Sequence, residues 1–157
     1  MAELNSAGAL QAALGYLARG SKSMAQVRQY LEKKGFQDGE IHAAMDRLLA
    51  YGFVDDQAYA RRFIATHPSN GQLLLRQKLR QRGIDQDTAQ DALSDVPEEE
   101  QVDQALEVLK KKLKGQRDRD AVRKAMQAAL RRGFPYAIVR SAAARYDEEA
   151  VEDLYDQ

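Results

Sequence analysis

Hydrophobic residues recur three and four positions apart along most of the chain, with polar and charged residues between them. This spacing places the apolar side chains on one face of a helix, which can then pack on a neighbouring helix. Alternation with a period of two, which is typical of half-buried strands, is weak throughout. The pattern predicts nine short amphipathic helices, with a possible tenth at 148–155. The segments that carry it are Leu10/Leu14/Leu17, Val27/Tyr30/Leu31, Ile41/Met45/Leu48, Tyr59/Phe63, Leu75/Leu79, Ala89/Leu93, Val102/Leu106/Leu109/Leu113, Val122/Met126/Leu130 and Ile138/Ala142/Tyr146.

Residues that start and stop helices lie between these segments. Three pairs have the spacing of a capping box, in which each side chain accepts a hydrogen bond from the other residue's backbone N–H: Ser23 with Gln26, Ser69 with Gln72, and Asp95 with Glu98. Glycines that can end helices stand at Gly35, Gly52, Gly83 and Gly133, and prolines suited to first helical turns stand at Pro97 and Pro135. These signals predict an all-helical protein with short connections.

The chain also repeats itself. VRQYLEKKGF (27–36), LRQKLRQRGI (75–84) and AMQAALRRGF (125–134) each place a helix, paired cations, a glycine and an apolar residue in the same order. Their glycines recur at intervals of about 50 residues, a period that is typical of helical repeat proteins. We therefore predict three tandem three-helix repeats, at 1–54, 55–96 and 97–157, that form an elongated or curved array. The third copy is divergent, because alanines replace larger apolar residues.

Composition excludes several classes of protein. The chain has no cysteine, so neither a disulfide framework nor a thiolate metal site can form. No apolar run approaches the roughly 18–20 residues that span a bilayer, and no basic leader precedes the first apolar residues. We expect a cytoplasmic protein with no membrane partner.

Charge is balanced in total but separated into blocks. The chain carries 24 basic and 24 acidic residues, which gives a net charge of zero. Residues 69–83 hold cations and no acid, whereas residues 85–100 hold acids and no base. A basic stretch at 110–119 likewise precedes an acidic one at 147–156. The total predicts no general affinity for polyanions, while the blocks predict surfaces of opposite sign.

Residues suited to catalysis or metal binding do not converge in the sequence. His42 and His67 are a helix apart and have no further ligand at metal-binding spacing, and the glycines match no phosphate-binding loop. Asp55 and Asp56 are adjacent at a predicted helix start, so we expect both to cap that helix and to oppose its dipole. We therefore expect no cofactor, no small-molecule substrate and no enzymatic activity.

Two strings, GFVDDQAYARRF (52–63) and GQLLLRQKLRQRGI (71–84), resemble the RecX family of bacterial recombinase regulators when read together with the repeats. In the first repeat the family pattern fits Ser23, Leu31, Gly35 and Phe36, and in the third it fits Leu130-Arg131-Arg132-Gly133-Phe134. The chain departs from the pattern at Leu73 and Leu74, where basic residues are usual, and at Gln26 and Lys78, where an acid is usual.

The resemblance implies a protein that binds the RecA filament on single-stranded DNA and inhibits its growth, ATP hydrolysis, strand exchange and coprotease activity. Such a protein modulates DNA repair, homologous recombination and the SOS response. On this reading we expect a monomer with possible weak direct DNA contact. Its candidate contacts are arginines in the three repeats: Arg61, Arg62, Arg76, Arg80, Arg131 and Arg132. Lys110–Lys114 rank lower, because consecutive lysines fan around a helix and share no single face.

Two other functions remain open from the residues alone. Helix-turn-helix-like units could bind DNA directly and without sequence preference, independently of RecA. A helical repeat protein could also serve as an adaptor for another protein complex.

Overall fold

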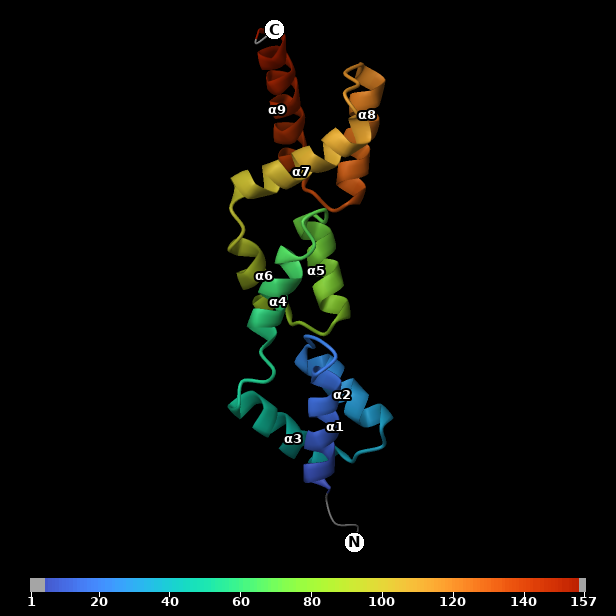
Figure 1. Ribbon diagram of the computed structural model, residues 1–157, viewed down its shortest axis with the longest axis vertical. Helices are drawn as coiled ribbons and strands as arrows, with labels where there is room; N and C mark the ends of the chain where they lie inside the picture. The colour runs from blue at the N-terminus through green and yellow to red at the C-terminus, as the bar shows by residue number, and fades with distance from the viewer. Residues whose placement is uncertain (1–4, 156–157) are drawn as a thin grey trace. The chain divides into compact units, whose positions relative to one another are not determined.

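The computed structural model describes residues 5–155, in which nine α-helices and no strands occur (Figure 1). This confirms the predicted all-helical class. The chain forms two compact units: the first contains Met1–Phe63 and Leu79–Ala89, and the second contains Ile64–Lys78 and Gln90–Gln157. The repeat boundaries at 54 and 96 stay predictions. The helices are α1 (Ser6–Leu17), α2 (Met24–Lys33), α3 (Asp38–Ala50), α4 (Asp56–Ala65), α5 (Gln72–Gln81), α6 (Gln86–Ser94), α7 (Glu98–Leu113), α8 (Arg119–Arg131) and α9 (Tyr136–Tyr155).

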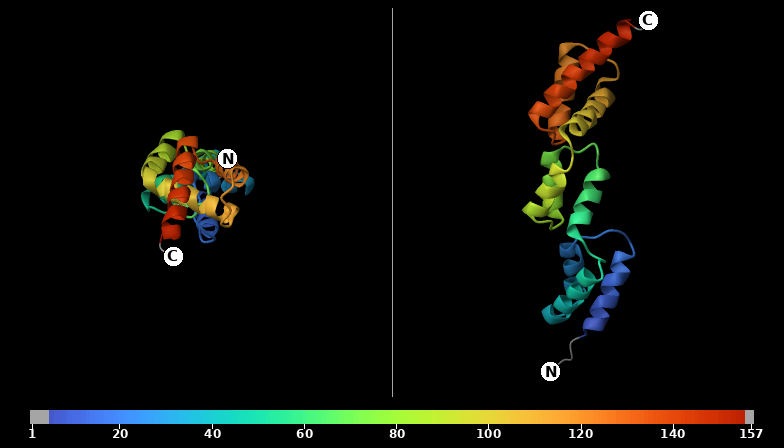
Figure 2. Two further views of the ribbon diagram at one scale, coloured as in Figure 1. Left: turned by 90° about the horizontal axis from the view of Figure 1, so that it is seen from above. Right: turned by 90° about the vertical axis from the view of Figure 1, so that its left-hand side faces the viewer.

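The core of the first compact unit lies among α1, α2 and α3. Ala9 and Ala13 are fully buried on α1, and their small side chains let the apolar face of α3 approach closely. α1 and α3 accordingly lie side by side, as the views in Figures 1 and 2 agree. Tyr16 of α1 stacks on Tyr30 of α2, with ring centroids 4.2 Å apart. The buried cluster is Ala9, Ala13, Val27, Leu31, Ile41, Ala44, Met45, Leu48 and Val54.

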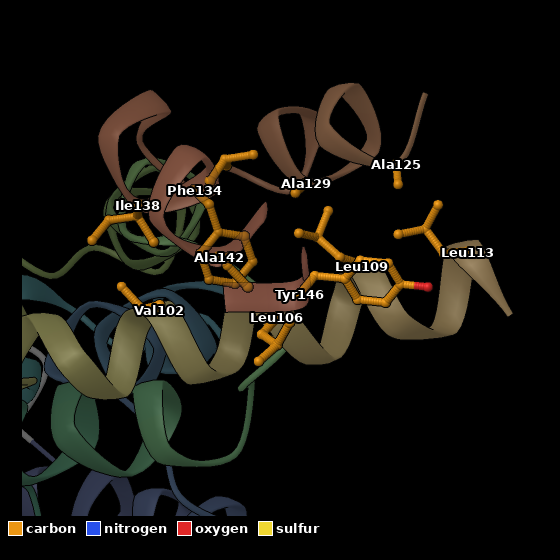
Figure 3. Packing of buried hydrophobic residues seen from close by; sticks show 12 residues of the cluster. Val102, Leu106, Leu109, Leu113, Ala125, Ala129, Phe134, Ile138, Ala142 and Tyr146 are labelled. Atoms are coloured by element: carbon orange, nitrogen blue, oxygen red, sulfur yellow. The ribbon is translucent and has the colours of Figure 1, made fainter. Parts of the chain in front are cut away.

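The core of the second compact unit is built by α7, α8 and α9. Leucines along one face of α7 point toward alanines of α8 and toward Phe134 and α9 residues, as Figure 3 shows. The alanines that made the third repeat look divergent, Ala125 and Ala129, are fully buried here. Small residues on α8 therefore complement large ones on α7, as close packing of an interior requires. Tyr146 of α9 belongs to this buried cluster, and its hydroxyl donates to the Gln116 carbonyl at 3.0 Å.

One predicted capping box is confirmed and two are wrong. Ser23 N–H donates to Gln26 Oε1 at 2.9 Å, and Gln26 N–H donates to Ser23 Oγ at 3.2 Å. Ser69 does not start α5, because the helix begins at Gln72 and that side chain instead donates to the Leu93 carbonyl at 3.0 Å. Asp95 does not start α7, because Pro97 occupies the residue before its first turn. Capping-box spacing alone therefore does not fix where a helix starts.

The possible tenth helix is not separate. α9 runs without interruption through the predicted boundary at 148, because most of residues 144–152 are good helix formers and no glycine or proline stands among them. The predicted helix-ending glycines are confirmed, since α2, α3, α5 and α8 each end two residues before one. These four glycines have positive φ, from +73° to +89°.

The start of α2 meets the turn that follows α5, and we call such a contact between a helix start and a glycine turn a joint. The hydroxyl of Ser23, directly before α2, donates to the Arg82 carbonyl at 2.6 Å. A Cβ on Gly83 would lie under 3.0 Å from the Cβ of Ala25. Met24 N–H donates to Asp56 Oδ1 at 2.9 Å, which ties the same helix start to α4. A glycine is therefore required at position 83 for contact as well as for its backbone conformation.

The start of α5 meets the turn that follows α8 in a similar way. Gly71 N–H donates to the Arg132 carbonyl at 2.8 Å, and Leu73 N–H donates to the Gly133 carbonyl at 3.0 Å. A Cβ on Gly71 would lie under 3.0 Å from the backbone of Phe134, and one on Gly133 would lie equally close to Leu74. First-turn N–H groups that have no partner within their own helix are thereby satisfied by the next repeat.

Replacing Gly133 with alanine should destabilise the protein more than the same change at Gly35. Both glycines have nearly the same φ, +89° and +88°, so each variant bears the cost of a left-handed alanine, about 1–2 kcal/mol. Only Gly133 has backbone atoms where the new methyl group would stand, whereas nothing lies within 4 Å at Gly35. Urea unfolding followed by circular dichroism measures both variants. Equal losses of stability would contradict the close approach at Gly133.

Candidate partner-binding surface

Five of the six candidate arginines have exposed side chains, and Arg76 is partly buried. Arg61, Arg62 and Arg80 belong to the first compact unit, and Arg76, Arg131 and Arg132 belong to the second. The six candidates are thus divided equally between the two units.

The arginines in and after α5 differ in their contacts with the rest of the chain. Arg76 Nη2 donates to Gln90 Oε1 of α6 at 2.8 Å, so its guanidinium is positioned by a neighbouring helix. Arg80 is exposed in the last turn of α5. Arg82, from the same basic block, places its guanidinium 4.4 Å from the centre of the Phe63 ring. The basic block is thus only partly a solvent-facing surface.

Arg131 and Arg132 lie at the end of α8, beside the joint with α5. The Arg132 backbone carbonyl accepts the hydrogen bond from Gly71, while both arginine side chains are exposed. The backbone at this position therefore serves the fold, and the side chains are available to a partner.

Arg62 lines an open hollow of about 500 Å³ in the first compact unit. The α1–α2 connection, the turn after α3 and one face of α4 form its walls, with Lys22, Phe53, Asp55 and Tyr59 among the lining residues. Phe53 is 56% exposed. Our sequence analysis did not select Lys22, Phe53 or Tyr59 as contacts. The available signal was a pair of aromatic residues, Tyr51 and Phe53, on either side of the helix-ending Gly52.

The two adjacent acids at the start of α4 have different roles. Asp55 Oδ1 accepts hydrogen bonds from Gln57 N–H at 3.0 Å and Ala58 N–H at 3.1 Å, which confirms the predicted cap. Asp56 stands in the first turn of α4, where its charge opposes the helix dipole as predicted, but the predicted cap is wrong for it, because its carboxylate turns to the start of α2 and accepts from Met24 N–H. One carboxylate suffices for the free amides of α4, so the second can serve the neighbouring helix.

Burial raises the pKa of Asp56 above its ordinary value of 3.8, and the negative charges of Asp85 and Asp55 act in the same direction. The hydrogen bond from Met24 opposes this rise without cancelling it. Nearby, the Thr88 N–H donates to Asp85 at 2.7 Å and lowers the pKa of that carboxyl. Placing a partly buried carboxylate close to an ionised one costs electrostatic free energy, and the fold retains this cost at the start of α4.

The acidic stretch near the chain's end pairs with the basic stretch on α7. Lys110 Nζ lies 2.9 Å from Glu149 Oε2, and this partner raises the pKa of Lys110. Arg117, which follows α7, donates to the Ala150 carbonyl. With the charges the other way round, Arg145 of α9 pairs with Asp103 of α7. Part of the basic stretch at 110–119 is thereby engaged within the second compact unit.

No cluster of three or more histidine, aspartate or glutamate side chains able to hold a metal ion occurs in the described part of the chain. His42 is exposed beside Asp46, and the His67 ring contacts the Thr66 hydroxyl. Among residues 5–155, no helix has both the length and the apolar character that crossing a bilayer requires.

Comparison with known proteins decides the family. Models of the first, second and third three-helix domains of RecX match residues 9–48, 55–93 and 98–142, in that order. The chain belongs to the RecX family. A Regulatory protein RecX from Clostridium botulinum (strain Eklund 17B / Type B) is 30% identical over 153 residues, which cover 93% of this chain and 70% of that protein. The three matches confirm the predicted tandem three-helix repeats.

Some RecX proteins are longer. The chain is 30% identical to Regulatory protein RecX of Geobacillus kaustophilus (strain HTA426), covering 87% of this chain and 53% of that protein. It thus spans about half the length of that relative. A crystal structure of RecX from Lactobacillus salivarius has the same fold, with a TM-score of 0.83 at 23% identity over 90% of this chain and 96% of that one. These relatives are named as regulatory proteins and not as enzymes.

One departure from the RecX pattern has a structural explanation. Gln26 stands where an acid is usual, yet its side chain completes the capping box with Ser23, a role that Glu and Gln share. Leu74 stands where a basic residue is usual, and only its backbone and Cβ are close to the site of Gly133, which does not explain its apolar side chain. Leu73 remains 54% exposed, and nothing in the structure explains its apolar side chain.

Asp56→Asn and Asp56→Ala should differ in their effect on stability at pH 7. Because the pKa of Asp56 is raised in the folded chain, its stabilising contribution is full below pH 3.8 and is lost as pH rises through the folded value. Asparagine removes the buried charge and keeps an oxygen acceptor for Met24, so we expect equal or higher stability. Alanine removes the acceptor and should cost about 1 kcal/mol.

Urea unfolding at pH 7 and pH 4 tests this pair of variants. The advantage of Asp56→Asn over the unmodified protein should shrink at pH 4, where the aspartate is closer to its neutral form. A loss of stability as large in the asparagine variant as in the alanine variant would show that the charge itself is needed.

Proposed function

We propose that this chain is a negative regulator of the RecA recombinase. It binds the RecA filament on single-stranded DNA and inhibits ATP hydrolysis, strand exchange and coprotease activity, and so modulates DNA repair and the SOS response. Membership of the RecX family, with its three domains in order, is the observation that carries this proposal. The role requires a cytoplasmic protein, which we expect to act as a monomer.

Charge supports binding to a filament. A RecA–DNA filament presents phosphates and charged protein surfaces, and arginine forms bidentate bonds with phosphate and carboxylate alike. Exposed arginines occur on α4, at the end of α5 and at the end of α8, so each of these elements can contribute contacts. The acids at 85–100 can face basic groups of the same partner, which would fix orientation as well as affinity.

Titrating the chain into RecA on single-stranded DNA should lower the ATPase rate. Inhibition by well under one chain per RecA subunit would support capping or disassembly of filaments, because few ends control many subunits. Full ATPase activity at equimolar protein would contradict the proposed regulation.

Charge reversal on α5, Arg76→Glu with Arg80→Glu, should weaken inhibition roughly tenfold without unfolding the chain. The physical reason is that two attractive charges become repulsive toward an anionic partner. The readout is the concentration that halves the RecA ATPase rate.

Lys111→Glu with Lys112→Glu is the matched control, because it changes net charge by the same amount at exposed positions of α7. Equal weakening by both double variants would mean that overall charge, and not the α5 surface, governs binding. No change in the α5 variant would remove Arg76 and Arg80 from the contact surface.

The second candidate function is a sequence-tolerant DNA-binding module that acts without RecA. The aromatic and basic lining of the hollow in the first compact unit favours it. Affinity for bare DNA that persists without RecA and falls steeply with salt would support this alternative.

A further inference from the structure

Four glycine turns close α2, α3, α5 and α8 with the same backbone hydrogen bond. In each turn the residue after the glycine donates its N–H to a carbonyl in the last turns of the helix: Phe36 to Leu31, Phe53 to Leu48, Ile84 to Leu79, and Phe134 to Ala129. This is the bond of a Schellman motif, in which the residue after the glycine commonly packs its apolar side chain back on the helix.

Phe53 departs from this rule. The Phe134 and Ile84 side chains are 1% and 3% exposed, and Phe36 is partly buried, whereas Phe53 is 56% exposed. Val54, the next residue, is buried in the core of the first compact unit instead. The turn conformation therefore does not require the Phe53 ring to be exposed. Exposing an aromatic ring to water is unfavourable unless a partner covers it.

The exposed ring borders the open hollow already described. Phe53 and Tyr59 both line it, and the Tyr51 ring stands edge-on to Phe53 with centroids 6.2 Å apart. Tyr51 is itself 66% exposed. Aromatic surface is thus concentrated at one edge of a concave site whose volume, about 500 Å³, is within the range of ligand pockets.

Cations line the same hollow. Lys22 and Arg62 both belong to the lining, and the Lys22 ammonium is held 4.8 Å from the centre of the Tyr16 ring. The one acid in the lining is Asp55, whose carboxylate already accepts two backbone hydrogen bonds at the start of α4. Its charge is therefore partly offset by the helix N-terminus, and the hollow remains suited to an anion.

We propose that this hollow binds single-stranded DNA directly, with a base stacked on Phe53 and flanking phosphates at Lys22 and Arg62. Aromatic platforms beside cations are the combination that binds single strands without sequence preference. A duplex fits less well, because its bases are stacked inside the helix and cannot lie on a protein ring. The inference rests on the proposed function for its biological setting but makes a separate physical claim, since it needs no RecA.

Fluorescence anisotropy with a labelled oligothymidylate and the full chain tests the proposal. Phe53→Ala should weaken binding roughly tenfold, because a stacked base loses its platform. Phe53→Trp should restore it. Lys22→Ala should weaken binding and reduce the dependence of affinity on salt, as expected for one lost phosphate contact.

Tyr136→Ala is the matched control. Tyr136 is 62% exposed at the start of α9 and belongs to the other compact unit, so it removes a comparable aromatic ring away from the hollow. Thermal unfolding of both variants should match the unmodified protein, because both rings are exposed. Equal affinities of Phe53→Ala and Tyr136→Ala would overturn the proposal, as would a lack of binding to oligothymidylate by the unmodified chain.

Parallel RecA ATPase assays separate this inference from the proposed function. If Phe53→Ala loses DNA affinity and keeps inhibition, the hollow binds DNA and inhibition has another basis. If Phe53→Ala loses inhibition and keeps DNA affinity, the hollow contacts protein and the nucleotide site is wrong. Failure of the unmodified chain to inhibit RecA, with DNA binding at the hollow intact, would contradict the regulatory function alone.

Discussion

The fold depends on how the start of one helix joins the glycine turn of the following repeat. A helix start has N–H groups without partners in its own helix, and a turn that ends a helix has carbonyls in the same situation. Joining the two satisfies both sets and requires no large apolar surface. Gly71 and Leu73 donate to the Arg132 and Gly133 carbonyls in this way, and Ser23 donates through its hydroxyl to Arg82. Close approach explains why glycine is needed at these turns.

The two joints satisfy the free groups of a helix start with different atoms. At α2 the capping serine provides a hydroxyl and Asp56 receives the Met24 N–H, so side chains make both bonds. At α5 a glycine replaces the serine, and the backbone itself donates. Removing a side chain lets the chains come closer, which in turn makes direct backbone bonds possible. Polar complementarity at the joint is thus maintained although the residues differ.

The sequence predicts the class and the repeat better than it predicts the contacts. Periodicity of Leu and Ala depends on local helix geometry, and a glycine ends a helix through its own φ, so both signals can be read locally. Asp56, Ser69 and Asp95 were assigned to nearby helix starts, but Asp56 bonds to the start of α2, and α5 and α7 begin after other residues. The six arginines could be listed as cations, but Arg76 bonding to Gln90 involves a residue of another helix. The hollow was missed because its walls come from segments distant in the chain.

The third repeat also differs from the first two in the length of the helix before its glycine. α2 and α5 each have 10 residues, whereas α8 has 13. Counting back from their glycines, α8 starts three residues earlier, which extends it by about 4.5 Å. Its first turn is closed by its own residue, because Asp118 accepts from Ala121 N–H at 3.2 Å. The start of α2 has both a local cap and a bond to the following repeat, and the start of α5 bonds to the following repeat through its backbone. The alanines of α8 let the extended helix lie close on α7.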